Sequence, residues 1–141
     1  MAFDGYLLYV KIGNSYTAFP NEYIDPKTYN STPNQRLEIK AVRNSSTAYL
    51  NRTTAPNTKT SLSFSTHPLH LNEMSKVRGI FNRAFTSRLQ RRLKIKYWND
   101  ETMDYREATA YMPDTVYTFI DIDSSSKDIL YGPATFEFIE Y

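Results

Sequence analysis

The sequence predicts a mainly β fold, a β-sandwich or a partly closed barrel of about seven or eight strands with one packed α-helix. The chain of 141 residues contains 12 tyrosines and 8 phenylalanines, and aromatic residues favour strands over helices. Apolar and polar residues alternate with period two along most segments, whereas one segment shows the 3.6-residue period of an amphipathic helix. Since no repeat and no long linker divides the chain, we expect residues 1–141 to form a single β-sandwich domain.

The expected helix lies near residues 72–90. Asn72 is a suitable N-cap because its side chain can accept a hydrogen bond from a free backbone N–H of the first turn. Apolar residues then recur three and four positions apart, at Met74, Val77, Ile80, Phe81, Ala84 and Phe85,. Arginines follow, where positive charge interacts favourably with the C-terminal end of the helix dipole. A sheet has to cover the apolar stripe, because one helix cannot bury it alone.

A long hairpin is expected near residues 93–112. Apolar and basic residues alternate from Leu93 to Trp98, which is typical of a strand,. The polar residues 99–102 supply a turn, and residues 105–112 form the returning strand. We expect the helix and this hairpin to form the centre of the fold.

Shorter alternating segments predict the remaining strands. They cover residues 6–12, 16–19, 35–42, 60–66, 116–122, 129–131 and 135–139,. The polar segments 20–34 and 44–57 are expected to be loops. Because both faces of segment 116–122 carry bulky side chains, we expect this strand to be central or covered by a neighbour.

The composition argues against several classes of protein. The chain has no cysteine, which rules out disulfides and thiolate chemistry. No apolar run approaches the roughly 20 residues of a membrane span, and the first residues lack the basic and apolar regions of a signal peptide. We therefore expect a protein that folds in the cytoplasm.

Charge is distributed unevenly along the chain. Residues 74–99 contain eight basic residues and no acidic ones, whereas residues 100–141 contain ten acidic residues and two basic ones. Two segments of opposite charge can pair within one subunit or head-to-tail between copies. Head-to-tail contacts between identical subunits can build rings.

Catalytic and metal-binding patterns are weak in this sequence. His67 and His70 lie three positions apart, but no further ligand lies near them in sequence, and a metal site needs three or four. Asp121 and Asp123 would share one face of a strand, where we interpret them as a solvated strand end rather than an acid–base pair. The sequence therefore predicts a protein that is not an enzyme and has no cofactor and no metal.

The basic segment leaves other binding functions open. Aromatic residues interleaved with basic ones can bind single-stranded nucleic acid through phosphates and base stacking. Tyrosines on a β-protein can also form a carbohydrate-binding face. We favour a surface between subunits, because the sequence that follows the basic segment is strongly acidic.

Several motifs together resemble a family of small tail-region proteins from phages and prophages of Gram-positive bacteria. They are Phe3–Leu8, Thr32–Arg36, Leu62–Thr66, the hairpin segment Ile95–Tyr105, the corner Tyr111–Asp114 and the end Phe136–Tyr141. The family has no assigned activity, and its pattern is similar to the N-terminal domain of distal tail proteins, which belong to the baseplate hub, and of tail-tube subunits. The resemblance implies a β-sandwich with one packed helix that assembles into rings, usually hexameric, around a channel for DNA.

On this basis we predict a structural subunit of a phage tail tip, in the virion tail, that forms a homo-oligomeric ring. The hairpin is expected to pair edge to edge with the next copy, and its basic surface to meet acidic residues of the segment 100–128 there. The expected interface residues are Arg88, Arg91, Arg92, Lys94, Lys96, Trp98, Tyr105, Glu107 and Tyr111. Expected partners are other copies of the chain and neighbouring tail proteins (tail tube, tape measure, hub or fibre proteins), with DNA only in transit. The alternatives are a tail-tube or tail-completion subunit and a carbohydrate-binding module.

Overall fold

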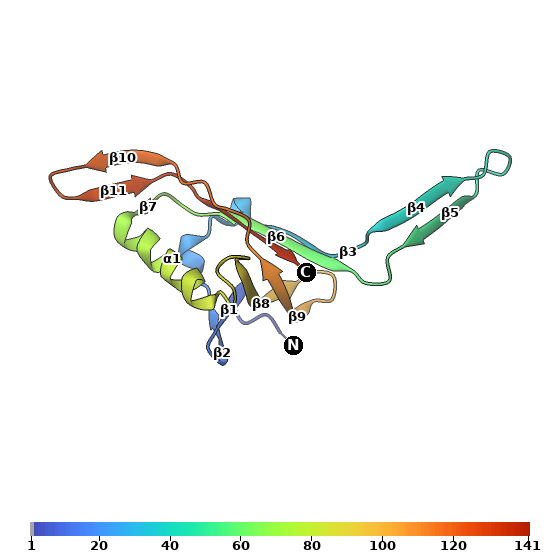
Figure 1. Ribbon diagram of the computed structural model, residues 1–141, viewed down its shortest axis with the longest axis horizontal. Coiled ribbons are helices and arrows are strands. Elements are labelled where there is room, and N and C mark those ends of the chain that lie inside the picture. Colours follow the sequence, from blue (N-terminus) through green and yellow to red (C-terminus); the bar gives the residue numbers. More distant parts are fainter. Residues whose placement is uncertain (1) are drawn as a thin grey trace.

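The computed structural model describes residues 2–141 and is mainly β, with one α-helix, as the sequence predicts (Figure 1). The strands in this part of the chain are β1 Leu8–Ile12, β2 Ser15–Ala18, β3 Asn30–Gln35, β4 Glu38–Arg43, β5 Leu50–Thr54, β6 Lys59–Ser65, β7 Leu69–His70, β8 Arg92–Asn99, β9 Asp104–Tyr111, β10 Phe119–Asp123, β11 Asp128–Tyr131 and β12 Thr135–Glu140. The helix α1 spans Leu71–Ala84, and two short 3-10 helices span Asn21–Tyr23 and Pro26–Thr28. The expected number of strands is therefore too low.

Seven of the strands form one antiparallel sheet with the order β2-β1-β8-β9-β12-β6-β3. The sheet ends at β2 and β3, so it does not close into a barrel. Tyr97 on β8 and Thr60 on β6 nevertheless approach each other, with 2.8 Å between their hydroxyl oxygens. In a flat sheet three strand spacings of about 4.8 Å would separate these strands. The sheet therefore folds over at the β9–β12 junction and gives a sandwich-like body.

Phenylalanines from four parts of the chain fill the space inside the folded sheet. The cluster consists of Phe19, Phe64, Phe81, Phe136 and Phe138, all at most 1% exposed. The Phe81 ring on α1 stacks on Phe19 at 5.3 Å and lies 5.0 Å from Phe136, measured between ring centroids. These contacts place α1 against the sheet, as the apolar stripe predicts.

Helix α1 is shorter than the expected segment 72–90. It starts at Leu71, and the N-cap is His70 rather than Asn72. The Glu73 carboxylate accepts a hydrogen bond from the His70 backbone N–H at 3.1 Å. The helix ends at Ala84 because the apolar period stops at Phe85 and the backbone N–H of Thr86 donates to the carbonyl of Arg92 at 2.7 Å. Residues 85–91 thus form a connection to β8 rather than a helix.

The hairpin expected near residues 93–112 is confirmed. Strands β8 and β9 pair from Arg92–Tyr111 to Asn99–Asp104. Strand β8 also pairs with β1, so β8 has no free edge for a neighbouring copy. Strand β9 pairs with β12 through Ala110 and Tyr111. Edge-to-edge pairing of the whole hairpin with another subunit, as the sequence suggested, is therefore wrong for β8.

Strands β4 and β5 form a two-stranded arm, here called the β4–β5 arm (residues 36–55), that leaves the body. The expected strand 35–42 is divided between β3 and β4, and the expected loop 44–57 contains β5. The expected loop 20–34 likewise contains both 3-10 helices and the first part of β3. Every residue of β4 and β5 is exposed, because the two strands pair with each other alone in the described chain. Alternation of apolar side chains therefore does not mark a buried face here.

Strands β10 and β11 form a second arm, the β10–β11 arm (residues 114–131), which β7 extends to three strands. The expectation of a central or covered strand at 116–122 is wrong, since every residue of β10 is exposed. Asp128, the first residue of β11, joins this arm to the start of α1. Its carboxylate lies 2.7 Å from the imidazole Nδ1 of His70 and accepts a hydrogen bond from the Leu71 backbone N–H at 3.3 Å.

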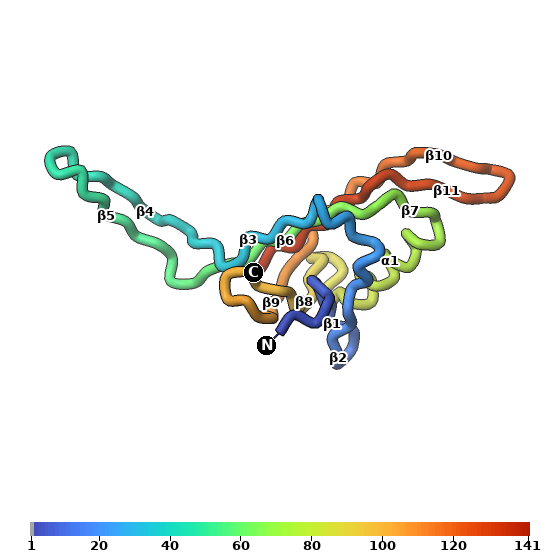
Figure 2. Tube along the Cα trace, turned by 180° about the vertical axis from the view of Figure 1, so that it is seen from behind, coloured from blue at the N-terminus to red at the C-terminus, as the bar shows by residue number. Residues whose placement is uncertain are grey.

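The two arms leave the body in opposite directions along its longest axis, and both views show this arrangement (Figures 1 and 2). The aromatic cluster lies between them and contains no residue of either arm. The fold thus consists of a small closed core and two projections. The β4–β5 arm adds nothing to that core, whereas Tyr117 and Tyr131 of the β10–β11 arm pack against it.

We expect substitutions in the core and in an arm to differ sharply in their effect on stability. Phe81→Ala should lower the free energy of unfolding by roughly 3–5 kcal/mol, because it empties a buried ring site. Phe119→Ala removes the same ring from a position that is 56% exposed and should cost less than about 1 kcal/mol. Urea unfolding followed by Trp98 fluorescence measures both values, and equal losses would contradict this division of the fold.

Candidate interaction surface

Seven of the nine expected interface residues lie on the outer face of the β8–β9 hairpin. The register sets Lys96 beside Glu107, Trp98 beside Tyr105 and Arg92 beside Tyr111. Lys94 lies between them on the same face, since side chains alternate along a strand. The intervening residues of β8 are buried. We call this surface, with the adjoining side chains of Tyr9, Lys11 and Tyr16, the outer sheet face.

Arg88 and Arg91 do not belong to this face. Arg91 has a positive φ of 51°, and its Nε donates to the carbonyl of Met112 at 2.8 Å. Its guanidinium lies 5.2 Å from the centroid of the Phe85 ring. Arg91 therefore joins the 85–91 connection to the end of β9, whereas Arg88 is exposed in that connection.

Residues 3–7, here called the N-terminal strap, cross one end of the outer sheet face. The Phe3 ring lies 5.3 Å from the Trp98 ring in an edge-on arrangement and 6.4 Å from the Tyr105 ring. The hydroxyls of Tyr9 and Tyr105 both donate to the carboxylate of Asp4. Trp98 and Tyr105, predicted as contacts with another subunit, thus already have partners in their own chain.

The hydrogen bonds within the strap change the pKa values of its groups. The hydroxyl of Tyr105, followed by that of Tyr9, lowers the pKa of Asp4 because each donates to the ionised carboxylate,. Burial, followed by the hydrogen bond to Asp4, raises the pKa of Tyr9. Asp4 is therefore ionised at neutral pH and both phenols are protonated, which is the state that holds the strap in place.

Lys96 lies at the centre of the outer sheet face among tyrosines. Its amino group is 4.4 Å from the centroid of the Tyr9 ring, 5.6 Å from that of Tyr105 and 5.7 Å from that of Tyr16. Contacts of a cation with aromatic faces are attractive. The charge of Lys96 is thus partly compensated within the subunit, whereas the sequence predicts that Lys96 contacts another subunit.

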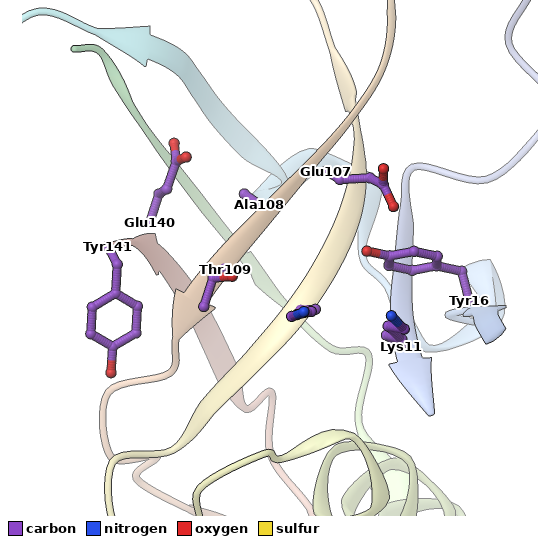
Figure 3. A pocket seen from close by; sticks show the side chains of 8 residues that line it. Lys11, Tyr16, Glu107, Ala108, Thr109, Glu140 and Tyr141 are labelled. Atoms are coloured by element: carbon purple, nitrogen blue, oxygen red, sulfur yellow. The ribbon is translucent and has the colours of Figure 1, made fainter. Parts of the chain in front are cut away.

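A shallow hollow lined by Lys94 lies on the same face. Figure 3 shows the Tyr16 hydroxyl pointing toward the carboxylate of Glu107, with Lys11 nearby and Glu140 and Tyr141 on the far side. Burial, followed by the negative charge of Glu107, raises the pKa of Tyr16 to about 12. A shallow, mixed-charge hollow of this kind suits contact with another protein surface better than enclosure of a small ligand.

The residues considered for chemistry have other roles. His70 pairs with Asp128, and residues 2–141 contain no group of three or more His, Cys, Asp or Glu side chains that could hold a metal ion. Asp123 accepts hydrogen bonds from the hydroxyl of Ser125 and from the backbone N–H groups of Ser125 and Ser126 in the turn of its arm. These bonds lower the pKa of Asp123 to about 2. Asp121 is exposed on β10.

The sequence did not indicate that the two arms expose their apolar side chains. On the β4–β5 arm these are Leu37, Ile39, Val42, Tyr49 and Leu50, and on the β10–β11 arm they are Val116, Phe119, Ile120 and Ile122, each between 37% and 78% exposed. Large apolar surfaces in water mark sites that another molecule covers. The arms therefore form a second candidate interaction surface, besides the outer sheet face.

A family model described as "Family of unknown function (DUF6711)" matches residues 1–141. No curated protein and no solved structure matches the chain. In the part of the chain that the structure describes, no helix has the length and apolar character needed to cross a membrane.

We expect the strap to detach in acid. Because the folded-state pKa of Asp4 is lowered, its contribution is complete above the ordinary aspartate pKa of about 3.9 and is lost as pH falls through the folded value. Emission of Trp98, the single tryptophan, should stay constant from pH 7 to pH 5 and shift to longer wavelength below about pH 4. Asp4→Asn should show that shift at pH 7, whereas Asp114→Asn should behave as wild type. Unchanged emission in Asp4→Asn would contradict this role of Asp4.

Arg91 and Arg88 should differ in their contribution to stability. Arg91→Ala removes a charge-assisted hydrogen bond to a backbone carbonyl and should lower the free energy of unfolding by roughly 1–3 kcal/mol. Arg88→Ala removes the same charge from an exposed site and should change it by less than about 0.5 kcal/mol. Thermal or urea unfolding of both variants measures the difference. If Arg91→Ala leaves the free energy of unfolding unchanged, the Arg91 side chain is not needed within the subunit and is available for contact with another subunit.

Proposed function

We propose that the chain, which belongs to the family of unknown function DUF6711, is a structural subunit of a phage tail tip. In this proposal the subunits close into a homo-oligomeric ring around the DNA channel, as distal tail proteins do. The resemblance of the motifs at Ile95–Tyr105 and Tyr111–Asp114 supplies the biological setting. The geometry of the two arms is the single observation that supports the proposed self-assembly.

The arms are poorly suited to a protein that acts alone. A two-stranded hairpin is marginally stable in water without a surface to pack on. The β4–β5 arm has no such surface within residues 2–141, and its Leu37 and Ile39 are 68% and 64% exposed. Unpaired strand edges beside exposed apolar side chains favour association with another chain. Assembly would cover both features at once.

The arrangement of the arms favours a closed ring of identical subunits. The arms differ in sequence and point in opposite directions (Figure 2), so a contact between them is heterologous. Heterologous contacts repeated around a rotation axis close into rings. The outer sheet face lies outside these arms and would then be available to neighbouring tail proteins, such as the tail tube, tape measure, hub or fibre proteins.

A tail-tube or tail-completion subunit would use the same contacts and remains the alternative within this setting. A carbohydrate-binding module would need exposed aromatic rings, and the largest candidate, Trp98, lies against Phe3 of the strap. The geometry thus favours protein contacts over sugar stacking on this face.

Light scattering of the purified protein tests the proposal. We expect a closed multimer near six copies of the 16.4 kDa chain at low salt, the number usual for distal tail rings. High salt should reduce the mass, because opposite charges across an interface are screened. Open fibres that lengthen with concentration would favour the tail-tube alternative. A monomer at both salt concentrations and at high protein concentration would contradict the ring.

A further inference from the structure

The two arms carry opposite charges. The β4–β5 arm (residues 36–55) contains four basic side chains and one acidic one, a net charge of +3. The β10–β11 arm (residues 114–131) contains four acidic side chains and one basic one, a net charge of −3. The values match in magnitude, although the arms share no contact within the chain and lie at its opposite ends (Figure 1).

Several of these charges lack an ionic partner within the subunit. The ion pairs of the described residues are Arg52 with Glu38, His70 with Asp128 and Arg106 with Asp104. They leave Lys40 and Arg43 on one arm, and Asp121 and Asp123 on the other, without an opposite charge in residues 2–141. All four residues are exposed.

The apolar side chains of the arms complement this charge pattern. On β4, Ile39 precedes Lys40 and Val42 precedes Arg43, so each basic side chain has an apolar neighbour in sequence and the two basic side chains lie on opposite faces,. On β10, Ile120 and Ile122 alternate with Asp121 and Asp123. In the described part of the chain the outer edge of β10 carries no paired strand, since β11 pairs with β10 on one side and with β7 on the other. Each arm thus offers apolar side chains, unpaired charges and an open strand edge.

The basic surface around Arg88–Lys96 is a weaker partner for the acidic arm. Arg91 is held by Met112, Arg92 lies 5.6 Å from the centroid of the Tyr141 ring, and Lys96 lies over Tyr9. No apolar side chain on the outer sheet face matches Ile120 and Ile122 in exposure, because its aromatic rings contact one another. The β4–β5 arm offers both positive charge and exposed apolar area.

We infer that the β10–β11 arm of one copy docks on the β4–β5 arm of the next copy, with the acidic side chains of one strand facing the basic side chains of the other. This inference rests on the proposed self-assembly and names the surface that produces it. The arms point in opposite directions (Figure 2), so a copy displaced along the longest axis and rotated about the ring axis brings its acidic arm to the basic arm of its neighbour. Each subunit gives one arm and receives the other, which leaves no arm uncovered in a closed ring.

Two complementary variants test the docking. One reverses the basic arm with Lys40→Glu and Arg43→Glu, and the other reverses the acidic arm with Asp121→Lys and Asp123→Lys. Each variant should lose its assembly, with the dissociation constant rising at least about tenfold because attraction becomes repulsion. In a 1:1 mixture every arm meets an arm of opposite charge on the other variant, so the mixture should assemble again as a multimer in which the two variants alternate. A chain with all four substitutions should assemble again, since the two reversed arms are complementary.

The control reverses two charges outside the arms, with Lys27→Glu and Lys76→Glu. Both side chains are exposed on the body, and the change in net charge equals that of the basic-arm variant. This control should keep the wild-type mass. Trp98 emission of each variant should match wild type, because the substituted residues lie outside the core.

The outcomes separate the docking from the proposed ring. If wild type is a closed multimer and either single-arm variant keeps the wild-type mass, the ring stands and the arm-to-arm docking is overturned. If one variant forms stable dimers on its own, each arm binds the same arm of a second copy, and the inference is also overturned. If the wild type is a monomer and the mixture of folded variants stays monomeric, both proposals fail together.

Discussion

The aromatic cluster inside the folded sheet is the contact on which the rest of the structure depends. Phe19 follows β2, Phe64 lies on β6, Phe81 on α1, and Phe136 and Phe138 on β12. Neighbouring ring centroids are 5.0 to 6.2 Å apart, within the range of favourable aromatic packing. Because these residues come from separate parts of the chain, one cluster fixes both halves of the sheet and the helix. The arms can project because this cluster of rings contains no residue of either arm.

The same core determines where each arm points. The β4–β5 arm follows directly from β3 and returns into β6, whose Leu62 and Phe64 are buried in the core. The β10–β11 arm is held at its other end by Asp128, which accepts a hydrogen bond from the first turn of α1. A carboxylate at a helix N-terminus is favourable because unpaired N–H groups and the helix dipole meet there. The arms are therefore directed by rigid elements rather than by flexible linkers.

Local periodicity in the sequence correctly predicted the elements that bury one face against the rest of their own chain. The stripe of α1 and the alternation of β8 were predicted correctly because each buries one face in the core. The turn after β8 was also predictable, since Asn99 accepts hydrogen bonds from the backbone N–H groups of Glu101 and Thr102,. Alternation also placed seven of the expected interface residues on one face. These features depend on neighbours in sequence, which is why the sequence reveals them.

The features that the sequence did not reveal depend on contacts across the chain or between chains. Asp4 meets Tyr105 across 101 positions, and no local pattern marks that contact. The positive φ of Arg91 removes it from the face to which its position in sequence assigned it. The arms are the most instructive case, because Leu37 and Ile39 alternate with charges as buried strands do and yet are exposed. A period of two shows that a strand has an apolar face and does not show which molecule covers it. For the arms, the subunit itself provides no cover, and the docking proposed above assigns that cover to the oppositely charged arm of another copy of the chain.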